Sequence, residues 1–174
     1  MRTDPLYVSA IKNQHGVAAV MVAIALATLL GIAALGIDVG YLYSTRNELQ
    51  NSADAAALAA TRKLGIIYQN MLPAQQQTYV CDQTTKTTIV KVAREVAEKK
   101  DRDGNVIFVI NAADIVIGTW DTSTRTLTPT LNQPDAVSVL ARRDSSANGR
   151  VTTFFAAIFK MFGGNLDTVG ITAD

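Results

Sequence analysis

The sequence predicts an α+β protein in which a long N-terminal helix packs on a small antiparallel sheet with accessory helices. Three observations lead to this prediction. The first is an apolar run of 22 residues without a charged side chain, from Gly16 to Ile37. The second is a spacing of three to four residues between apolar or small side chains, which continues from this run to Leu64. The third is a change to the two-residue periodicity of β-strands after Gly104.

The apolar run has the length and composition of a membrane-spanning helix. Eighteen of its 22 residues are apolar, and a helix of this size spans about 33 Å, close to the ~30 Å hydrocarbon core of a bilayer. A secretory signal peptide has an apolar region of about 7–15 residues that ends at a cleavage site, whereas here the helical pattern continues. We therefore favour a retained anchor over a cleaved signal or a buried core helix.

The basic residues favour a cytoplasmic N-terminus. Arg2, Lys12 and the titratable His15 precede the run together with one aspartate, while the twenty residues after Ile37 hold one basic residue, Arg46. Because positive charge is retained on the cytoplasmic side of a membrane, we expect the rest of the chain to be exported. In a bacterium with two membranes it faces the periplasm, and the anchor lies in the inner (cell) membrane.

Small residues recur along the run at a spacing that suits helix packing. They are Ala19, Ala23, Ala27 and Gly31, followed by the close pair Gly36 and Gly40. Such a stripe lets a neighbouring helix approach closely in lipid, although an alanine-rich span also produces this spacing by chance. We expect helix–helix packing at these six residues.

Residues 38–65 continue as an amphipathic helix. Its apolar face includes Leu49, Ala53, Ala56, Ala60 and Leu64, and its polar face Asn47, Asn51, Asp54 and Arg62. Gly65 is the first plausible stop signal, so one helix is expected from about Gly16 to Leu64. Asp38 either pairs with a partner helix or marks the boundary with water, and Tyr41 and Tyr43 suit an interfacial aromatic belt.

Residues 66–174 are predicted to form the exported domain. A polar connection leads to a helix over 84–100, with Ile89, Val92, Ala93 and Val96 on its buried side and a solvated charged face that includes the pairs Lys91–Glu95 and Glu95–Lys99. Strands are expected at 105–110, 114–120, 125–130 and 136–143, with Pro129 indicating an edge strand, and a short apolar helix at 152–162. The last segment, 168–173, looks like the start of another strand, so we expect the native protein to continue beyond Asp174.

The sequence supplies no catalytic constellation. With 16 basic and 15 acidic residues its formal charge is +1, which gives no electrostatic case for nucleic-acid binding. His15 and Cys81 lie on opposite sides of the membrane in the predicted topology, so Cys81 is expected to be a lone thiol. Gly163-Gly164 ends a predicted helix instead of opening one, so no phosphate loop is present in the sequence. We expect no enzyme activity, metal, cofactor or small-molecule substrate.

One short motif resembles the start of the metal site of von Willebrand A domains, D-x-S-x-S. It begins at Asp121, but its fifth position holds Arg125, which cannot supply the second hydroxyl. We therefore interpret residues 121–125 as a hairpin turn.

The stretch from His15 to Ala60 resembles the N-terminal module of TadE/TadG-like Flp (Tad) pilus-assembly proteins. It combines the apolar span and the following Asp38-Val39-Gly40 with Leu49-Gln50-Asn51 and the specific signature ADAAALAA at 53–60. The later segments VIGTWDTSTRTLTPT, PDAVSVLARR and FFAAIF resemble the C-terminal module found with it. The resemblance implies a pilin-like fold and a pseudopilin-like component of a machine that builds adhesive pili.

The predicted organisation is a cytoplasmic flank at 1–15, a transmembrane helix at 16–37, an amphipathic extension at 38–65 and an exported domain at 66–174. Prepilin peptidase substrates carry Glu five residues after the cleavage-site Gly. Counted from Gly16 that position is Met21, so we expect a permanent anchor instead of a processed protein that begins at Val17. The expected partners are other Tad proteins or pilins, the lipid bilayer, and further copies of the chain. The alternative function is a self-assembling fibre subunit whose N-terminal helices pack in the filament core.

Overall fold

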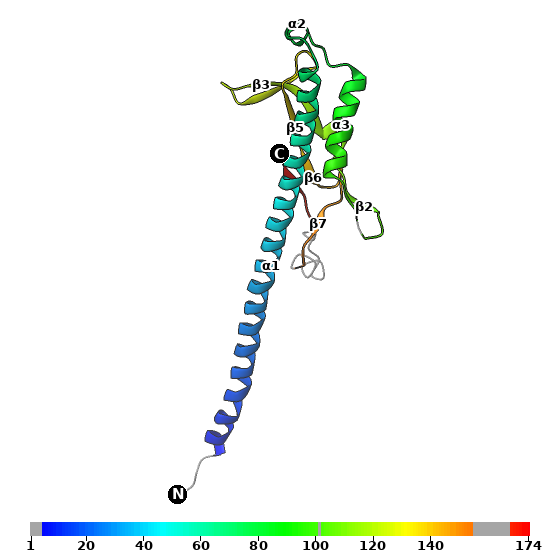
Figure 1. Cartoon of the computed structure of the whole chain (residues 1–174). Coiled ribbons are helices and arrows are strands. Elements are labelled where there is room, and N and C mark those ends of the chain that lie inside the picture. The colour runs from blue at the N-terminus through cyan, green and yellow to red at the C-terminus, as the bar shows by residue number, and fades with distance from the viewer. Residues whose placement is uncertain (1–4, 101, 155–167) are drawn as a thin grey trace. The chain divides into compact units, whose positions relative to one another are not determined.

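The computed structural model describes residues 5–100, 102–154 and 168–174 (Figure 1). The chain divides into two compact units. The first comprises Met1–Tyr41 and Thr153–Asp167, and the second comprises Leu42–Thr152 and Thr168–Asp174. One helix, α1 (Pro5–Gln69), contributes to both units.

Helix α1 is longer at both ends than the predicted range. Its start at Pro5 suits proline, because the first position of a helix needs no N–H donor and has the φ that proline fixes. Gly65 does not stop it, since Ile67 and Tyr68 beyond it pack against the core and outweigh the cost of about 1 kcal/mol of a helical glycine. The helix ends at Gln69, shortly before Pro73 opens the next one.

The half of α1 in the second unit is amphipathic, as predicted. Its buried residues include Leu49, Ala53, Ala56, Ala60 and Leu64, and its exposed residues include Asn47, Asn51, Asp54 and Arg62. Ser52 is polar and nevertheless buried, and its hydroxyl donates to the Glu48 carbonyl oxygen at 2.9 Å. This bond to the preceding turn satisfies the hydroxyl inside the protein.

Two shorter helices follow α1. Helix α2 (Pro73–Gln76) is one turn long, and α3 (Gln83–Ala97) carries buried Ile89, Ala93 and Ala97. Val96, predicted to be buried, is 52% exposed, because Ala97 takes the inward position of the last turn. The helix ends before the predicted residue 100, since Glu98 is extended and the residues after it form a strand.

Within the described residues the strands form four small antiparallel sheets. The largest has the order β4-β3-β5, from β3 (Ile115–Asp121), β4 (Thr126–Pro129) and β5 (Ala136–Val139). Pro129 therefore lies on an edge strand, as predicted. The two-stranded sheets pair β1 (Lys99–Lys100) with β2 (Val106–Phe108), β6 (Ala141–Arg143) with β9 (Ile171–Ala173), and β7 (Val151–Thr152) with β8 (Thr168–Val169). A 3₁₀ turn, η1 (Ala112–Asp114), precedes β3.

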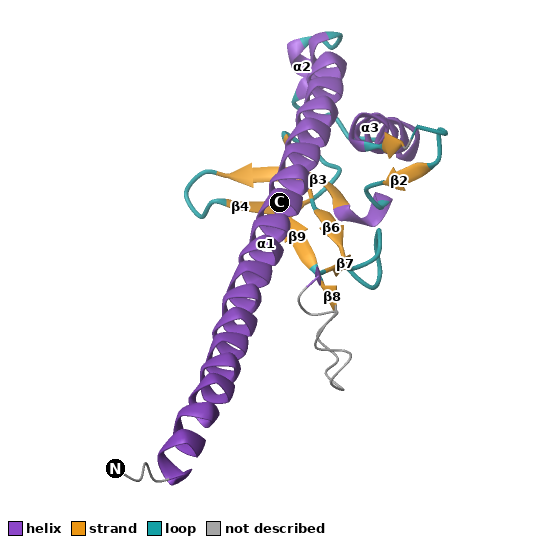
Figure 2. Ribbon diagram, turned by 90° about the horizontal axis from the view of Figure 1, so that it is seen from below, coloured by secondary structure: helices purple, strands orange, loops and turns teal. Residues whose placement is uncertain are grey.

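The single strand predicted at 136–143 is divided in two. Val139 pairs with Ile115 in β3, whereas Ala141 pairs with Ala173 in β9. Figure 2 shows β6 beside β9. The Leu140 N–H still donates to the Asp114 carbonyl oxygen at 2.8 Å, next to the Ile115–Val139 pair, so the chain changes partner after Leu140. The short helix predicted at 152–162 lies largely outside the described residues.

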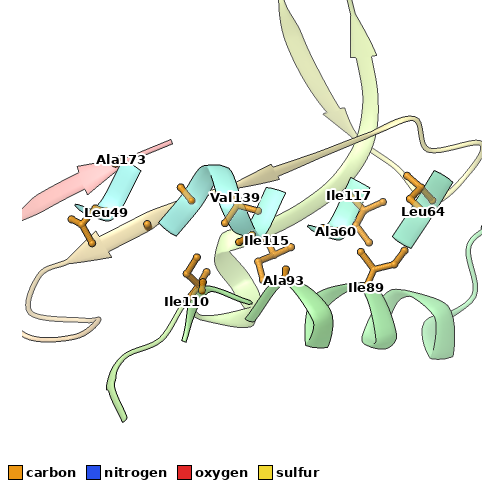
Figure 3. Close-up of a cluster of buried hydrophobic side chains, with 14 of the residues drawn as sticks. Leu49, Ala60, Leu64, Ile89, Ala93, Ile110, Ile115, Ile117, Val139 and Ala173 are labelled. Carbon is orange, nitrogen blue, oxygen red and sulfur yellow. The ribbon is translucent and has the colours of Figure 1, made fainter. Parts of the chain in front are cut away.

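The core of the second unit lies between α1, α3 and the β4-β3-β5 sheet. Ile89 on α3 points toward Leu64 on α1 and Ile117 on β3, and all three are buried (Figure 3). Burial of an aliphatic side chain of this size contributes about 1.5–3 kcal/mol. A long helix thus joins small antiparallel sheets and short helices, and the predicted α+β fold class is confirmed.

Candidate membrane-spanning surface

The first half of α1 presents apolar side chains to its surroundings on every face. Across residues 16–37 each residue is exposed except Gly31 and Ala34, which are partly exposed. Met21 is 67% exposed and Leu30 70% exposed. By length and composition this helix is able to cross a membrane. A helix that is apolar on every side is stable inside lipid or inside a protein core. Within the described part of the chain, no residue buries the most apolar stretch of α1.

The predicted packing stripe lies on this surface. The first four residues are four apart and form a ridge on one side of the helix, while Gly36 and Gly40 form a second pair displaced around it. All six are exposed except Gly31, which is partly exposed. Apart from the adjacent backbone of α1 itself, no described atom lies within 4 Å of the position that a Cβ would take at Gly36 or Gly40. Their small size therefore answers no packing need within the described chain, and their role in helix packing stays a prediction.

The bond between Gly16 and Val17, weighed above as a prepilin-type processing site, lies inside a continuous helix. Gly16 is exposed, and α1 runs from Pro5 through Gly16 and Val17 without a break. Because a protease needs an extended substrate, cleavage here requires local unwinding of α1. That the chain keeps a permanent anchor and is not cleaved at this bond stays a prediction.

Asp38 contacts another segment of its own unit. Its side chain is 6% exposed, and its Oδ1 accepts the backbone N–H of Phe154 at 2.7 Å. Thr153 beside it is buried, whereas the Phe154 side chain is 68% exposed. The sequence left two alternatives for Asp38, pairing with a partner helix or a position at the boundary with water. The structure instead pairs it with a residue 116 positions later, for which the sequence has no local signal.

The lone thiol is a core group. Cys81 is 1% exposed, and its Sγ donates to the Asp82 carbonyl oxygen at 3.7 Å. Burial raises the pKa of the thiol, and burial followed by the neighbouring Cys81 raises the pKa of the Tyr79 phenol to about 12. The Tyr79 ring meets Tyr68 edge to face, with ring centroids 5.2 Å apart. A protonated, inaccessible thiol is chemically inert, so this group stabilises the fold.

The motif at 121–125 is a hairpin turn, as predicted. It joins β3 to β4, and the Asp121 carboxylate accepts the Ser123 N–H at 2.8 Å, the Ser123 hydroxyl at 2.6 Å and the Thr124 N–H at 3.3 Å. These bonds lower the pKa of Asp121 to about 2. The carboxylate is thus occupied by its own turn.

The charged face of α3 borders an open groove of about 640 Å³. Lys91 and Glu95 form the predicted ion pair at 3.7 Å, whereas Lys99 pairs with Glu48 of α1 at 3.7 Å instead of with Glu95. Such exposed pairs are worth less than about 1 kcal/mol each. Over the described residues no three His, Cys, Asp or Glu side chains gather in a group that could hold a metal.

Comparison with known protein families gives a match over part of α1. Residues 16–65 match the family model Tad, described as Flp pilus-assembly TadE/G-like. No curated protein and no solved structure matched the chain. The match confirms the resemblance over the helix that carries the apolar surface and the ADAAALAA signature. The resemblance of the later segments to the C-terminal module stays a prediction.

Proposed function

We propose that this protein is a membrane-anchored, non-enzymatic, pseudopilin-like component of a Tad/Flp-type pilus assembly system. Residues 1–15 are its cytoplasmic flank, residues 16–37 cross the inner membrane, residues 38–65 extend the helix, and residues 66–174 form an exported domain. One observation on α1 supports the proposal. The residues that match the pilus-assembly family include the exposed apolar surface of this helix.

The physical basis of assembly is helix packing in lipid. Inside a bilayer the hydrophobic effect does not drive helices together, so association depends on close backbone approach and van der Waals contact. The ridge of Ala19, Ala23, Ala27 and Gly31 allows such an approach by a helix of another pilus component. Its exposure in the isolated chain leaves it accessible to that partner.

Deletion of the gene tests the proposal. Cells without the protein are expected to lose surface pili and adhesion, and the full chain supplied in trans restores both. Membrane fractions from the restored cells should contain the protein, and it should stay with the membrane after a high-salt wash, because a spanning helix is not held by charge. Unchanged pili and adhesion in the deletion strain would overturn the proposal.

A second candidate is a self-assembling fibre subunit with its N-terminal helices packed in the filament core. The same ridge of small residues favours it, because identical helices can pack through identical ridges. Purified full-length protein that forms filaments when detergent is removed would support this candidate. A protein that stays strictly monomeric in detergent and in vesicles would exclude it and leave the assembly role in place.

A further inference from the structure

The hydrogen bond between Asp38 and Phe154 fixes a second segment of the first unit beside the end of the apolar run. Asp38 follows Ile37 directly, and one residue adds only about 1.5 Å along a helix. The Phe154 N–H donates to Asp38 Oδ1 at 2.7 Å, and Asp38 and Thr153 are both buried. The backbone of Phe154 therefore lies within one side chain of the level at which the membrane-spanning residues end.

The apolar side chains at this level are exposed in several directions. Phe154 is 68% exposed, and on α1 Leu35 is 52%, Ile37 66% and Val39 47% exposed. Successive residues of this α1 set are two apart and so point about 200° from one another around the helix. A protein partner covers one face of a helix, whereas lipid surrounds it. Exposure on two opposite faces of α1, continuous with the apolar run, favours lipid as the material that covers Phe154.

We propose that Phe154 is a second membrane contact of this chain, with its ring in the interfacial layer of the leaflet from which α1 emerges. The inference rests on the membrane anchoring stated under Proposed function. Aromatic rings are favoured at this depth. The hydrogen bond that positions the ring also gives the Asp38 carboxylate a donor. This carboxylate lies at the edge of the low-dielectric region, where a charge without a hydrogen bond is costly. Asp38 is thus the positioning residue and Phe154 the residue that touches lipid.

Tryptophan fluorescence in lipid vesicles tests this inference on the full chain. The one native tryptophan is removed by Trp120→Phe, and a single reporter is placed by Phe154→Trp or, as a control within the span, by Leu29→Trp. Each protein is reconstituted into phosphatidylcholine vesicles with bromine near the headgroup end or the tail end of the acyl chains. We expect Phe154→Trp to be quenched at least about twofold more by the shallow bromine than by the deep one.

Two further variants test the role of Asp38. In the Phe154→Trp protein, Asp38→Asn keeps an acceptor oxygen and should keep the shallow quenching. Asp38→Ala removes the acceptor and should reduce shallow quenching by at least about twofold while Leu29→Trp is unchanged. Equal quenching in the two variants would overturn the positioning role.

The control separates failure of this inference from failure of the anchor. If Leu29→Trp is quenched and Phe154→Trp is not, the ring does not contact lipid and the anchor stands. If neither reporter is quenched, the membrane anchoring itself is wrong. If Phe154→Trp is protected from both brominated lipid and aqueous acrylamide, protein from the same chain or a second copy covers the ring and the lipid contact is overturned.

Discussion

Gly118 lies in the middle of β3, between Pro129 of β4 and Ala136 of β5. A Cβ at this position would collide with the Thr128 carbonyl oxygen and would come within 3.1 Å of the Pro129 Cα. Both obstacles are backbone, which cannot rotate away as a side chain does. Glycine is therefore required here by the close approach of the neighbouring strand.

Substitution Gly118→Ala is expected to lower the free energy of unfolding of the full chain in detergent by about 1–3 kcal/mol, because the strands must separate. The matched control is Gly65→Ala on α1, where no described atom beyond the adjacent helix backbone lies within 4 Å of the new Cβ. That change should raise the free energy by about 0.5–1 kcal/mol. Urea denaturation followed by Trp120 fluorescence measures both, and a Gly118→Ala protein as stable as wild type would contradict the packing argument.

The Asp121 carboxylate gives the second prediction at the scale of the residue. Hydrogen bonds from Ser123 and Thr124 lower its pKa from 3.8 to about 2 in the folded protein. A lowered folded-state pKa contributes stability that is fully present above the unfolded value and is lost as the pH falls from about 4 to about 2. Carbon-13 NMR of the Asp121 carboxyl group should show a midpoint near the lower value. A midpoint at or above 3.8 would mean that the turn does not hold the carboxylate.

Among the elements, α3 depends on its N-cap. The Asp82 carboxylate accepts the Thr85 N–H at 2.8 Å, and the bonds from Thr85 lower the pKa of Asp82. Since Ile89 and Ala93 on this helix belong to the core, loss of the cap weakens the packing of the second unit as well as the helix.

Substitution Asp82→Ala should lower the free energy of unfolding by about 0.5–2 kcal/mol. Asp82→Asn keeps a capping oxygen and should lower it by only a few tenths of a kcal/mol. Urea denaturation of the two variants side by side gives the comparison. Equal losses would show that the charge of Asp82 matters and that its capping bond does not.

The periodicity of α1 predicted its buried face correctly because that face depends on residues close in sequence. The ends of elements were predicted less well, since they depend on distant contacts. Gly65 marks a stop in the sequence, but the core beyond it holds Ile67 and Tyr68 in the helix. The segment 136–143 alternates like one strand and is divided at Leu140, because Val139 pairs with Ile115 of β3 and Ala141 pairs with Ala173 of β9.

The same distinction applies to the candidate site. The apolar run and the small-residue ridge are visible in the sequence because they repeat at short intervals. The partner of Asp38 is not, because Phe154 follows 116 residues later and contributes a backbone N–H that every residue type except proline has. The buried state of Cys81 was likewise missed, since its neighbour Tyr68 comes from α1 and Tyr79 from the connection between α2 and α3.

At the scale of the whole molecule, the exposed helix surface and the bonded titratable groups favour a protein that acts by contacting other molecules. The residues that match the pilus-assembly family lie on a helix with an exposed apolar surface, and the titratable groups described above hold turns, caps and core in place. The central claim is that this helix acts in pilus assembly through its ridge of small residues. The ridge is therefore the place to test it.

The most direct measurement is the number of pili per cell in a deletion strain that carries one of two double variants. Ala23→Leu with Ala27→Leu fills the ridge. Ala18→Leu with Ala25→Leu adds the same side chains on the opposite side of the helix, at 100° per residue.

Both variants stay apolar and should reach equal membrane levels on an immunoblot. The account predicts a loss of pili of about tenfold in the ridge variant, the size expected if 1–2 kcal/mol of helix packing is removed, and wild-type numbers in the control. Wild-type numbers in the ridge variant, or equal losses in both, would contradict it.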